Sequence, residues 1–266
     1  MQIIKNLISK KVFLNLFFVF FLISSIKYLT SLLYFIILMD VTKISKYDNN
    51  IDYESPIDTY FFLPFATLFV DIAYKLNLTP NQITFLSALS TSISGYFIIK
   101  KNKKYAIICY LLGYFFDCLD GILARKYNLG TQMGAVYDMS SDIFTNFVIV
   151  SCLIYTKIDK LKCYHYLLLF LFSLGIMFCH GITEAIHSYK DDGNDNFYQK
   201  ILEKYKNKSD NLLVKIYINA NKNSYSLYKY FFKEYNNEQL HKYINIFKYF
   251  GPGSFNMLIV YLIYCI

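Results

Sequence analysis

Long apolar runs, separated by shorter polar segments, organise this chain. The runs are nearly continuous and show neither the period of 2 of a half-buried strand nor the period of 3.6 of a surface helix. A helix crosses the hydrocarbon core of a bilayer in about 20 residues. The candidate crossings are residues 12–39, 83–99, 105–124, 134–156, 163–183 and 254–266. We therefore predict an all-α fold, a polytopic membrane bundle of about six transmembrane helices.

The first apolar run follows several lysines, as it would in a secretory signal peptide. No small-x-small cleavage motif comes after it, and the run is long enough to cross a membrane. We expect residues 1–58 to form an uncleaved membrane anchor with a polar linker behind it.

Two further regions differ from the continuous runs. The stretch TYFFLPFATLFVDIAYKLN, residues 59–77, is apolar and aromatic but is interrupted by Pro64, Asp71 and Lys75, which favours an interfacial amphipathic helix over a crossing. Residues 188–248 are rich in Lys, Asn, Tyr, Asp and Glu and hold half of the net positive charge. We expect them to form a solvated or surface-lying polar loop, although attraction to anionic lipid headgroups is the alternative interpretation of their charge.

Composition agrees with a membrane protein, since 55% of the residues are hydrophobic and 20% are aromatic, with a formal net charge of +8. The six cysteines lie in or beside apolar runs and show no CxxC spacing. They indicate packing residues and favour neither a zinc site nor a disulfide framework.

Four aspartates interrupt two neighbouring runs. Asp117 and Asp120 are three residues apart, and Asp138 and Asp142 are four apart, so each pair projects from one face of its helix. Only residues 125–133 connect the two helices, which makes them antiparallel and puts the carboxylates at one membrane level. A carboxylate facing lipid at the bilayer centre costs about 2.5 to 3.5 kcal/mol, so the four acids must face the protein interior, a wet cavity or cations.

Converging carboxylates repel one another, and protons or hard cations must neutralise them. Mg²⁺ prefers oxygen ligands and also bridges phosphates, so this cluster predicts a divalent-metal site that handles phosphate. Small residues near the acids, including Gly121, Ala124 and Gly134, leave room for a ligand. Arg125 could grip a phosphate oxygen with its planar guanidinium, or serve as an interfacial anchor.

The spacing Asp-x2-Asp-Gly-x2-Ala-Arg-x8-Gly-x3-Asp-x3-Asp, from Asp117 to Asp142, closely resembles the motif of the CDP-alcohol phosphotransferase family. A transporter whose acids pair with lysines does not require Gly121, Arg125 and Gly134 at these intervals. UbiA-type prenyltransferases also hold magnesium diphosphate on membrane aspartates, but their motifs lack this frame. The resemblance is clearest over residues 79–146 and implies a family membrane domain over residues 59–266, with 188–248 as its polar loop.

The resemblance implies that a CDP-linked donor binds through its diphosphate to two Mg²⁺ or Mn²⁺ ions, and that an alcohol attacks the distal phosphorus and releases CMP. The implied metal ligands are Asp117, Asp120, Asp138 and Asp142, and Asp142 is also the implied general base. The implied nucleotide-binding residues are Gly121, Ala124, Arg125, Gly134 and Asn81. Asn81 belongs to the stretch LTPNQIT, in which Pro80 and Asn81 also indicate a helix start.

The resemblance further implies an enzyme of phospholipid biosynthesis, embedded in the bilayer as a multi-pass protein, with its active site facing the cytosol. Its expected partners are the CDP-linked donor, a lipid substrate and a second copy of the chain in a homodimer. We expect no nucleic-acid partner.

The stretch NLGTQMGAVYDMSSD gives an indication of the acceptor alcohol. It resembles the corresponding stretch of phosphatidylinositol synthases. The matching positions are Asn128, Thr131, Gly134, Ala135, Asp138 and Met139. Those enzymes usually carry Arg after the last Asp, where this chain has Ile143. Choline and ethanolamine phosphotransferases resemble the TPNQIT stretch but typically have a His-Gly pair where this chain has Met139 and Ser140. An inositol-type acceptor is our first hypothesis, with those enzymes, or a catalytically silent protein of the same fold that binds nucleotide or lipid, as alternatives.

Overall fold

The structure is a computed structural model that describes residues 54–157, 161–192, 196–232 and 237–265. All described residues lie in one compact unit of the chain. The expected anchor at residues 12–39 therefore lies outside the described residues.

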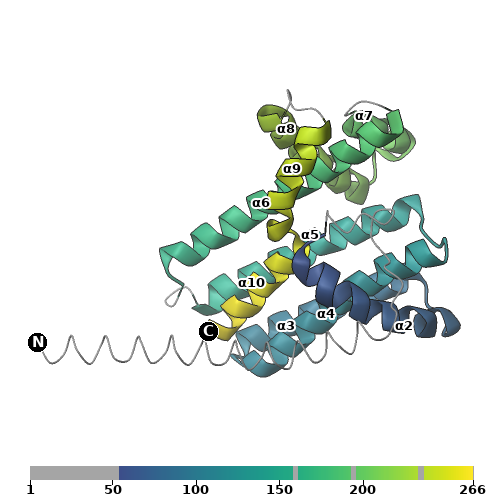
Figure 1. Ribbon diagram of the computed structural model, residues 1–266. Coiled ribbons are helices and arrows are strands. Elements are labelled where there is room, and N and C mark those ends of the chain that lie inside the picture. The colour runs from purple at the N-terminus through teal and green to yellow at the C-terminus, as the bar shows by residue number, and fades with distance from the viewer. Residues whose placement is uncertain (1–53, 158–160, 193–195, 233–236, 266) are drawn as a thin grey trace, which may run out of the picture. The chain divides into compact units, whose positions relative to one another are not determined.

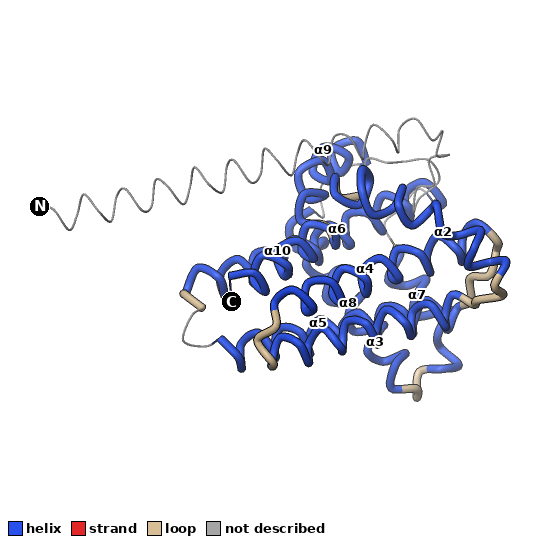
Figure 2. Tube along the Cα trace, turned by 90° about the horizontal axis from the view of Figure 1, so that it is seen from below, coloured by secondary structure: helices blue, strands red, loops and turns tan. Residues whose placement is uncertain are grey.

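The described residues are helical throughout, with no strand among them (Figures 1 and 2). A π-helical turn, Asp58–Phe62, leads into the first α-helix. The α-helices are α2 (Leu63–Lys75), α3 (Pro80–Ile99), α4 (Lys103–Lys126), α5 (Gln132–Lys157), α6 (Cys163–Asp192), α7 (Phe197–Tyr205), α8 (Leu212–Phe232), α9 (Asn237–Phe247) and α10 (Pro252–Cys265). This order confirms the predicted all-α class.

Five helical segments among the described residues are long and apolar enough to cross a membrane. They are Pro80–Ile99, Lys103–Lys126, Gln132–Thr156, Cys163–Tyr189 and Asn237–Cys265. The first four confirm the predicted crossings at 83–99, 105–124, 134–156 and 163–183. The last is longer than the predicted 254–266, because α9 and a short 3₁₀ turn extend α10 toward the N-terminus.

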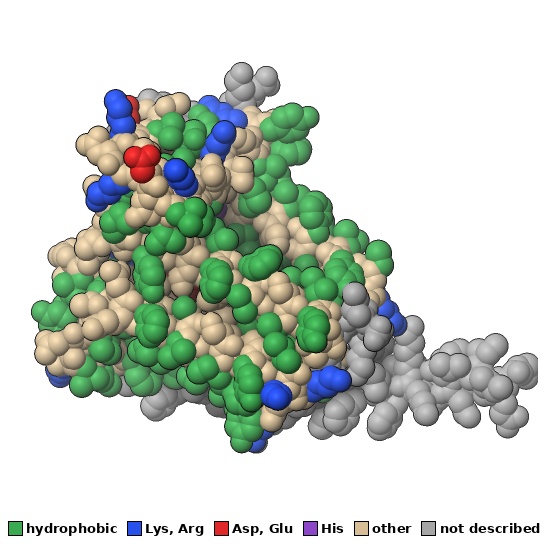
Figure 3. Space-filling view, turned by 180° about the vertical axis from the view of Figure 1, so that it is seen from behind, with side chains coloured by type: hydrophobic (Ala, Val, Ile, Leu, Met, Phe, Trp, Pro, Cys, Tyr) green, Lys and Arg blue, Asp and Glu red, His purple; other side chains and the backbone are tan. Residues whose placement is uncertain are grey.

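The distribution of charge on the surface agrees with a helical membrane bundle. On the face shown in Figure 3, Lys and Arg side chains gather at the top, over α7 and α8, and along the lower edge, while the band between them is apolar or uncharged. Many large apolar side chains of the crossing helices are exposed, among them Phe85, Phe144, Phe147 and Phe170. Such side chains fit a lipid environment, in which apolar surface needs no protein cover.

Helix α3 packs extensively against both α4 and α5, whose backbones contact each other much less. Small polar residues of α3, including Ser87, Thr91 and Ser94, are buried against α4, and Ser94 donates a hydrogen bond to the Ala106 carbonyl at 2.8 Å. Small residues allow close approach of membrane helices, and interhelical hydrogen bonds add to this packing. Helix α3 thus holds α4 and α5 near each other, as expected. Because α4 and α5 do not pack closely on one another, the acidic side chains lie between them.

Helix α2 confirms the helix predicted over residues 59–77. Its buried residues Ala66, Val70 and Ala73 pack against α4, and its other face exposes Phe69 and Ile72. Exposed apolar residues on this face are compatible with a membrane surface, and the interfacial position stays a prediction.

A buried carboxylate, Asp58, joins the beginning of α2 to α4 and α10. It accepts hydrogen bonds from the Tyr114 hydroxyl, the Ser55 hydroxyl and, at 3.0 Å, the backbone N–H of Gly253. A buried charge requires such partners, because transfer from water to an apolar environment is otherwise very costly. Asp58 therefore holds the first turn of the last crossing helix against the bundle.

The segment 188–248 differs from the polar loop that we expected, since it contains the helices α7, α8 and α9. Its aromatic residues recur at helical spacing, and Tyr228 and Phe232 of α8 pack with Ile182 and Ile186 of α6 in one buried cluster. Helix α8 also contacts α5. The prediction rested on overall polarity, whereas the spacing of three or four residues between buried side chains determines whether a polar segment forms a packed helix.

The α3–α4 contact generates a stability prediction. A Cβ atom added at Gly113 would overlap Thr91 Oγ1 and would lie 3.2 Å from the Ser87 carbonyl oxygen. We expect Gly113→Ala to lower the free energy of unfolding by about 1 to 3 kcal/mol through overpacking. The measurement is thermal unfolding in detergent. Thr91→Ala in the same chain removes the overlapping hydroxyl and should restore part of the loss, and an undiminished Tm for Gly113→Ala alone would contradict this packing.

Candidate metal and active site

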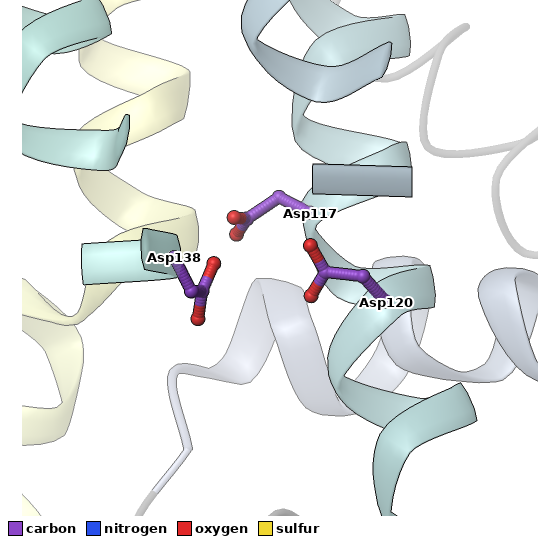
Figure 4. Close-up of side chains that lie close together, drawn as sticks. All are labelled: Asp117, Asp120 and Asp138. Atoms are coloured by element: carbon purple, nitrogen blue, oxygen red, sulfur yellow. The ribbon is translucent and has the colours of Figure 1, made fainter. Parts of the chain in front are cut away.

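Three of the four predicted aspartates meet in the structure. Asp117 and Asp120 project from α4 and Asp138 projects from α5, and one carboxylate oxygen from each lies within 4.8 Å of the other two. Figure 4 shows the three side chains pointing toward one another across the space between their helices. The spacing of three residues puts Asp117 and Asp120 on one face of α4, as the sequence predicted.

The chemistry of these ligands fits a hard divalent cation. Oxygen ligands lie about 2.0 to 2.6 Å from Mg²⁺ or Ca²⁺, so two ligands of one ion are at most about 4 to 5 Å apart. The separations among Asp117, Asp120 and Asp138 are compatible with this limit. The cluster could therefore hold a metal ion, and all of its donors are carboxylates.

Asp120 is held in place by a residue that the sequence analysis did not single out. The Thr84 hydroxyl of α3 donates a hydrogen bond to Asp120 Oδ2, and the two side chains are each only 4% exposed. Thr84 lies in the first turns of α3, where a capping box between Thr79 and Gln82 begins the helix. The stretch LTPNQIT, already recognised as a helix start, contains Thr84, but only the packing of α3 on α4 shows that this hydroxyl reaches an acid.

Asp142 lies one helical turn after Asp138 on α5 and is partly buried. It is a hydrogen-bond partner of Asp117 on the facing helix, so it adjoins the three-residue cluster without being one of its three members. A hydrogen bond between two carboxyl groups requires a shared proton, and a cation between them removes that requirement. All four acids therefore converge, as the sequence predicted.

Arg125 lies over Gly121 on the last turns of α4. Its guanidinium nitrogens are 3.1 Å from the position that a Cβ atom of Gly121 would occupy. Arg125 is exposed and is close enough to Asp120 for electrostatic attraction. Ala124 is half-buried on the same helix. Because Gly121 has no side chain, the Arg125 guanidinium can lie against the backbone of α4, near Asp120.

Gly134 lies in the first turn of α5, beside α3. A Cβ atom there would lie 2.9 Å from Thr131 Oγ1 and 3.2 Å from Asn81 Oδ1. The Thr131 hydroxyl accepts a hydrogen bond from the Gly134 N–H at 2.9 Å, which satisfies a backbone donor at the start of α5. Since Thr79 and Gln82 cap α3, Asn81 is left with its exposed side chain next to Gly134.

The ends of α2 and α4 are joined beside Arg125. The Asp71 carboxylate forms an ion pair with Lys126 and accepts a hydrogen bond from the Tyr127 hydroxyl at 2.7 Å. The hydrogen bond from Lys126, followed by that from Tyr127, lowers the pKa of Asp71. The hydrogen bond to Asp71 in turn raises the pKa of Tyr127 to about 12. Tyr74 stacks on Tyr127 with ring centroids 3.6 Å apart, so α2 is attached at the helix end that carries Arg125.

A second residue missed from the sequence is Asn221 of α8, which is 1% exposed. Its amide nitrogen is 3.7 Å from the Met139 sulfur, next to Asp138, and its Oδ1 is 3.0 Å from His180 Nε2 of α6. Asn221 thereby links α5, α6 and α8 behind the acidic cluster. Its signal in the sequence was only a polar residue at a helical interval among apolar ones.

These features define a class of protein: a helical membrane bundle with converging carboxylates that could hold a metal ion. Residues 77–202 match the family model described as CDP-alcohol phosphatidyltransferase, which confirms the resemblance seen in residues 117–142. The matched segment contains all four aspartates, Arg125 and both glycines of the motif.

The chain is also similar to several curated proteins over short stretches. The CDP-diacylglycerol–glycerol-3-phosphate 3-phosphatidyltransferase of Aquifex aeolicus is 30% identical over 79 residues, which are 29% of this chain and 44% of that protein. The CDP-diacylglycerol–inositol 3-phosphatidyltransferase of Candida albicans is 42% identical over 64 residues, 24% of this chain and 27% of that protein. The archaetidylinositol phosphate synthase of Pyrococcus horikoshii is 36% identical over 68 residues, 26% of this chain and 36% of that protein.

The chain thus spans less than half the length of each of these relatives. No solved structure gives a significant match to the chain.

The contact between Thr84 and Asp120 generates a prediction about metal affinity. Thr84→Val keeps the shape of the side chain but removes the hydroxyl that orients Asp120, and loss of such an outer partner commonly costs about 10- to 100-fold in metal affinity. We expect Mn²⁺ binding, measured by electron paramagnetic resonance in nanodiscs, to weaken by about 10-fold.

Two variants serve as controls for this measurement. Thr84→Ser retains a hydroxyl and should retain affinity. Thr67→Val removes a hydroxyl that bonds only within its own helix, to the Leu63 carbonyl at 2.7 Å, and should have no effect. A Thr84→Val protein that binds Mn²⁺ as tightly as the parent would remove Thr84 from the site.

Proposed function

We propose that this protein is a membrane-embedded, divalent-metal-dependent CDP-alcohol phosphotransferase of phospholipid biosynthesis, which transfers a phosphatidyl group from CDP-diacylglycerol to an inositol-type alcohol. The observation that carries the proposal is the convergence of Asp117, Asp120 and Asp138 within a segment that matches the family. Intact acids at every position of the motif argue against the alternative of a catalytically silent protein that binds nucleotide or lipid.

The proposed reaction is a single phosphoryl substitution. The hydroxyl oxygen of the acceptor forms a bond to the phosphorus that carries diacylglycerol. The bond from this phosphorus to the oxygen that bridges it to CMP breaks, and CMP leaves with the electron pair. Asp142 accepts the hydroxyl proton as general base, a role that suits a carboxylate next to the metal ligands.

The proposed ligands of two Mg²⁺ or Mn²⁺ ions are Asp117, Asp120, Asp138 and Asp142. When bound, such ions neutralise charge that develops on phosphoryl and leaving-group oxygens. The chain's own residues orient the donor: Arg125 binds a phosphate oxygen with its guanidinium, and the small residues Gly121, Ala124 and Gly134 allow the nucleotide to approach the backbone. Asn81, beside Gly134, offers a side-chain amide to the nucleotide.

The inositol-type acceptor has support from two directions. The stretch around Asp138 resembles phosphatidylinositol synthases, and two of the similar proteins carry an inositol-derived product or substrate in their names. A choline or ethanolamine phosphotransferase that uses diacylglycerol is the alternative, on the resemblance of the TPNQIT stretch. The chain is also similar to a CDP-diacylglycerol–glycerol-3-phosphate 3-phosphatidyltransferase. An assay that compares several alcohols is therefore needed to identify the acceptor.

We further propose that residues 1–58 form the membrane anchor and linker, that residues 59–266 form the catalytic domain, and that the enzyme acts as a homodimer with its active site facing the cytosol. The ends of α4 and α6 and the beginning of α5 lie on one side of the bundle, because α4, α5 and α6 are joined by short connections. The lysine-bearing helix α7 follows α6 on that side, whereas Lys100, Lys101, Lys103 and Lys104 lie at the connection of α3 and α4 on the other side, against the positive-inside tendency. The proposed orientation therefore rests on the resemblance of the motif.

The first prediction of this proposal concerns substrates and metal. Purified protein in nanodiscs should release CMP from CDP-diacylglycerol when an inositol-type alcohol is present, and much less from CDP-choline with diacylglycerol. Chelation with EDTA should abolish this release, and added Mg²⁺ or Mn²⁺ should restore it, because the carboxylate cluster needs cations to bind a diphosphate. The measurement is CMP release by chromatography. Full activity in excess EDTA would refute the metal role, and no CMP release with any donor and acceptor pair would refute the enzyme.

A second prediction separates binding from chemistry. Asp117→Ala should weaken metal and donor binding together, because it removes a ligand of the diphosphate clamp. Asp142→Asn should mainly lower the single-turnover rate of CMP release, by about 10²- to 10⁴-fold, since an amide keeps the shape but does not accept the proton. Donor affinity and single-turnover rate are measured for each variant. Turnover of Asp142→Asn within a few-fold of the parent would end its assignment as the base.

A further inference from the structure

Helix α2 ends before the segment that matches the family, and it packs against α4. Asp71 of α2 accepts hydrogen bonds from the side chains of Lys126 and Tyr127, two successive residues at the end of α4. The Tyr74 ring, one turn after Asp71, is stacked on the Tyr127 ring with an interplanar angle of 1°. We call these four residues, Asp71, Tyr74, Lys126 and Tyr127, the α2–α4 clamp.

The ion pair of the clamp does not fix the end of α4 by itself. The side chains of Asp71 and Lys126 are 56% and 32% exposed, and an exposed ion pair contributes little because water screens both charges. The Tyr127 ring, however, is partly buried and packs against the cluster that contains Ala73 and Leu123. This anchored ring also has a stacked aromatic neighbour, an arrangement that aromatic pairs favour. The clamp therefore acts mainly through Tyr127.

Tyr127 is the residue that caps the end of α4, two positions after Arg125. Asn128 follows in the left-handed conformation, with a φ of 54°, and the Leu129 N–H donates a hydrogen bond to the Ala124 carbonyl at 2.9 Å. This is the pattern of a Schellman motif, with Asn where Gly is usual. The last turn of a helix otherwise frays. A clamp on the capping residue therefore restricts the turn that carries Arg125.

Helix α2 also leads directly into α3, whose first turn carries Asn81. Only residues 76–79 separate the two helices. The Leu78 N–H in this connection donates a hydrogen bond to the Ala73 carbonyl at 3.1 Å, and a capping box fixes the first turn of α3. A connection that is this short and hydrogen-bonded couples the position of Asn81 to that of α2. The clamp thus links the turn of α3 that carries Asn81 to the turn of α4 that carries Arg125.

We propose that the residues of the α2–α4 clamp are positioning residues for the CDP-linked donor, because they hold Arg125 and Asn81 at one fixed separation. The inference rests on the proposed function. Misplacement of a binding group by about 1 Å can cost about 10²-fold in rate, so exposed contacts away from the acids can still affect the reaction. The acidic cluster has its own support in the hydrogen bond from Thr84 to Asp120. Loss of the clamp therefore weakens donor binding and leaves metal binding intact.

The test first measures binding without turnover. Cytidine diphosphate, which carries the nucleotide and diphosphate of the donor, is titrated with Mg²⁺ into the protein in nanodiscs by isothermal titration calorimetry. Tyr74→Leu should weaken its binding by about 10-fold and Asp71→Ala by about 5-fold, because each frees Tyr127. Tyr74→Phe keeps the stacked ring and should retain most of the affinity. Mn²⁺ binding by electron paramagnetic resonance should stay within about twofold in all three variants, since no partner of the metal ligands is changed.

A matched control, a double variant and kinetics complete the design. Tyr96→Leu removes an exposed tyrosine at the other end of α3 and should bind cytidine diphosphate like the parent. Asp71→Ala combined with Tyr74→Leu should cost less than the product of the two single effects, since both act through Tyr127. In turnover, Tyr74→Leu should raise the KM for the CDP-linked donor by about 10-fold, while kcat and the KM for the alcohol stay within about twofold. If Tyr74→Leu does not fold, Asp71→Ala, a change at an exposed side chain, provides the same test.

The outcomes separate this proposal from the proposed function. Equal affinity of Tyr74→Leu, Asp71→Ala and the parent for cytidine diphosphate would overturn the clamp, and so would a parallel loss of Mn²⁺ binding. CMP release by these variants with the donor KM of the parent would leave the phosphotransferase standing without the clamp. Binding of cytidine diphosphate that depends on the clamp, in a protein that releases no CMP from any donor, would instead support the clamp and refute the proposed enzyme.

Discussion

Charge buried between membrane helices is the constraint on which the rest of this structure depends. Asp117, Asp120 and Asp138 converge between α4 and α5, and Asp142 joins them through its hydrogen bond with Asp117. In a medium without bulk water, such a group of acids needs cations, protons or hydrogen-bond donors. The bundle supplies donors, such as the Thr84 hydroxyl, and leaves room for cations. Features that otherwise look unrelated, including the small residues of α3 and the cap at Thr79, hold these helices in the required positions.

Helix α3 has a larger part in this arrangement than its apolar sequence suggests. It packs on both α4 and α5, so the two acid-bearing helices are spaced by a third helix and do not need to contact each other closely. The close approach at Gly113 and the hydrogen bond of Ser94 hold α3 against α4. The same helix then brings Thr84 to Asp120 and Asn81 to Gly134. One element therefore sets both the spacing of the acids and their immediate surroundings.

The helices after α6 give the bundle a second polar region of a different character. The acidic cluster is built from carboxylates alone, whereas the pocket between α6, α7 and α8 is lined by two lysines, Lys200 and Lys204, together with Glu184 and other polar residues. The beginning of α5 lies between the two regions and contacts α7 and α8 directly. The packing of α8 on α5 and α6 separates the two regions.

Much of the fold and of the site followed from the sequence alone, for physical reasons. Long apolar runs define crossing helices because a bilayer imposes a fixed length, so α3, α4 and α5 were predicted to within a few residues, whereas α6 extends nine residues beyond its predicted end at Thr183. The acids were predicted because helical periodicity places residues three or four apart on one face, and the short connection between α4 and α5 brings the two pairs together.

What only the tertiary structure decided depends on contacts between residues distant in the chain. Thr84 and Asn221 have no distinctive local pattern, and their roles arise from the packing of α3 on α4 and of α8 on α5 and α6. The polar segment 188–248 appeared to be a loop because its composition is hydrophilic, yet the aromatic face of α8 is buried against α6. The position of α7 beside α5 depends on a hydrogen bond from the Tyr205 hydroxyl to the Gln132 carbonyl, 73 positions apart. Local pattern determines which segments are helices, but side-chain packing determines which helix faces meet and what chemistry they enclose.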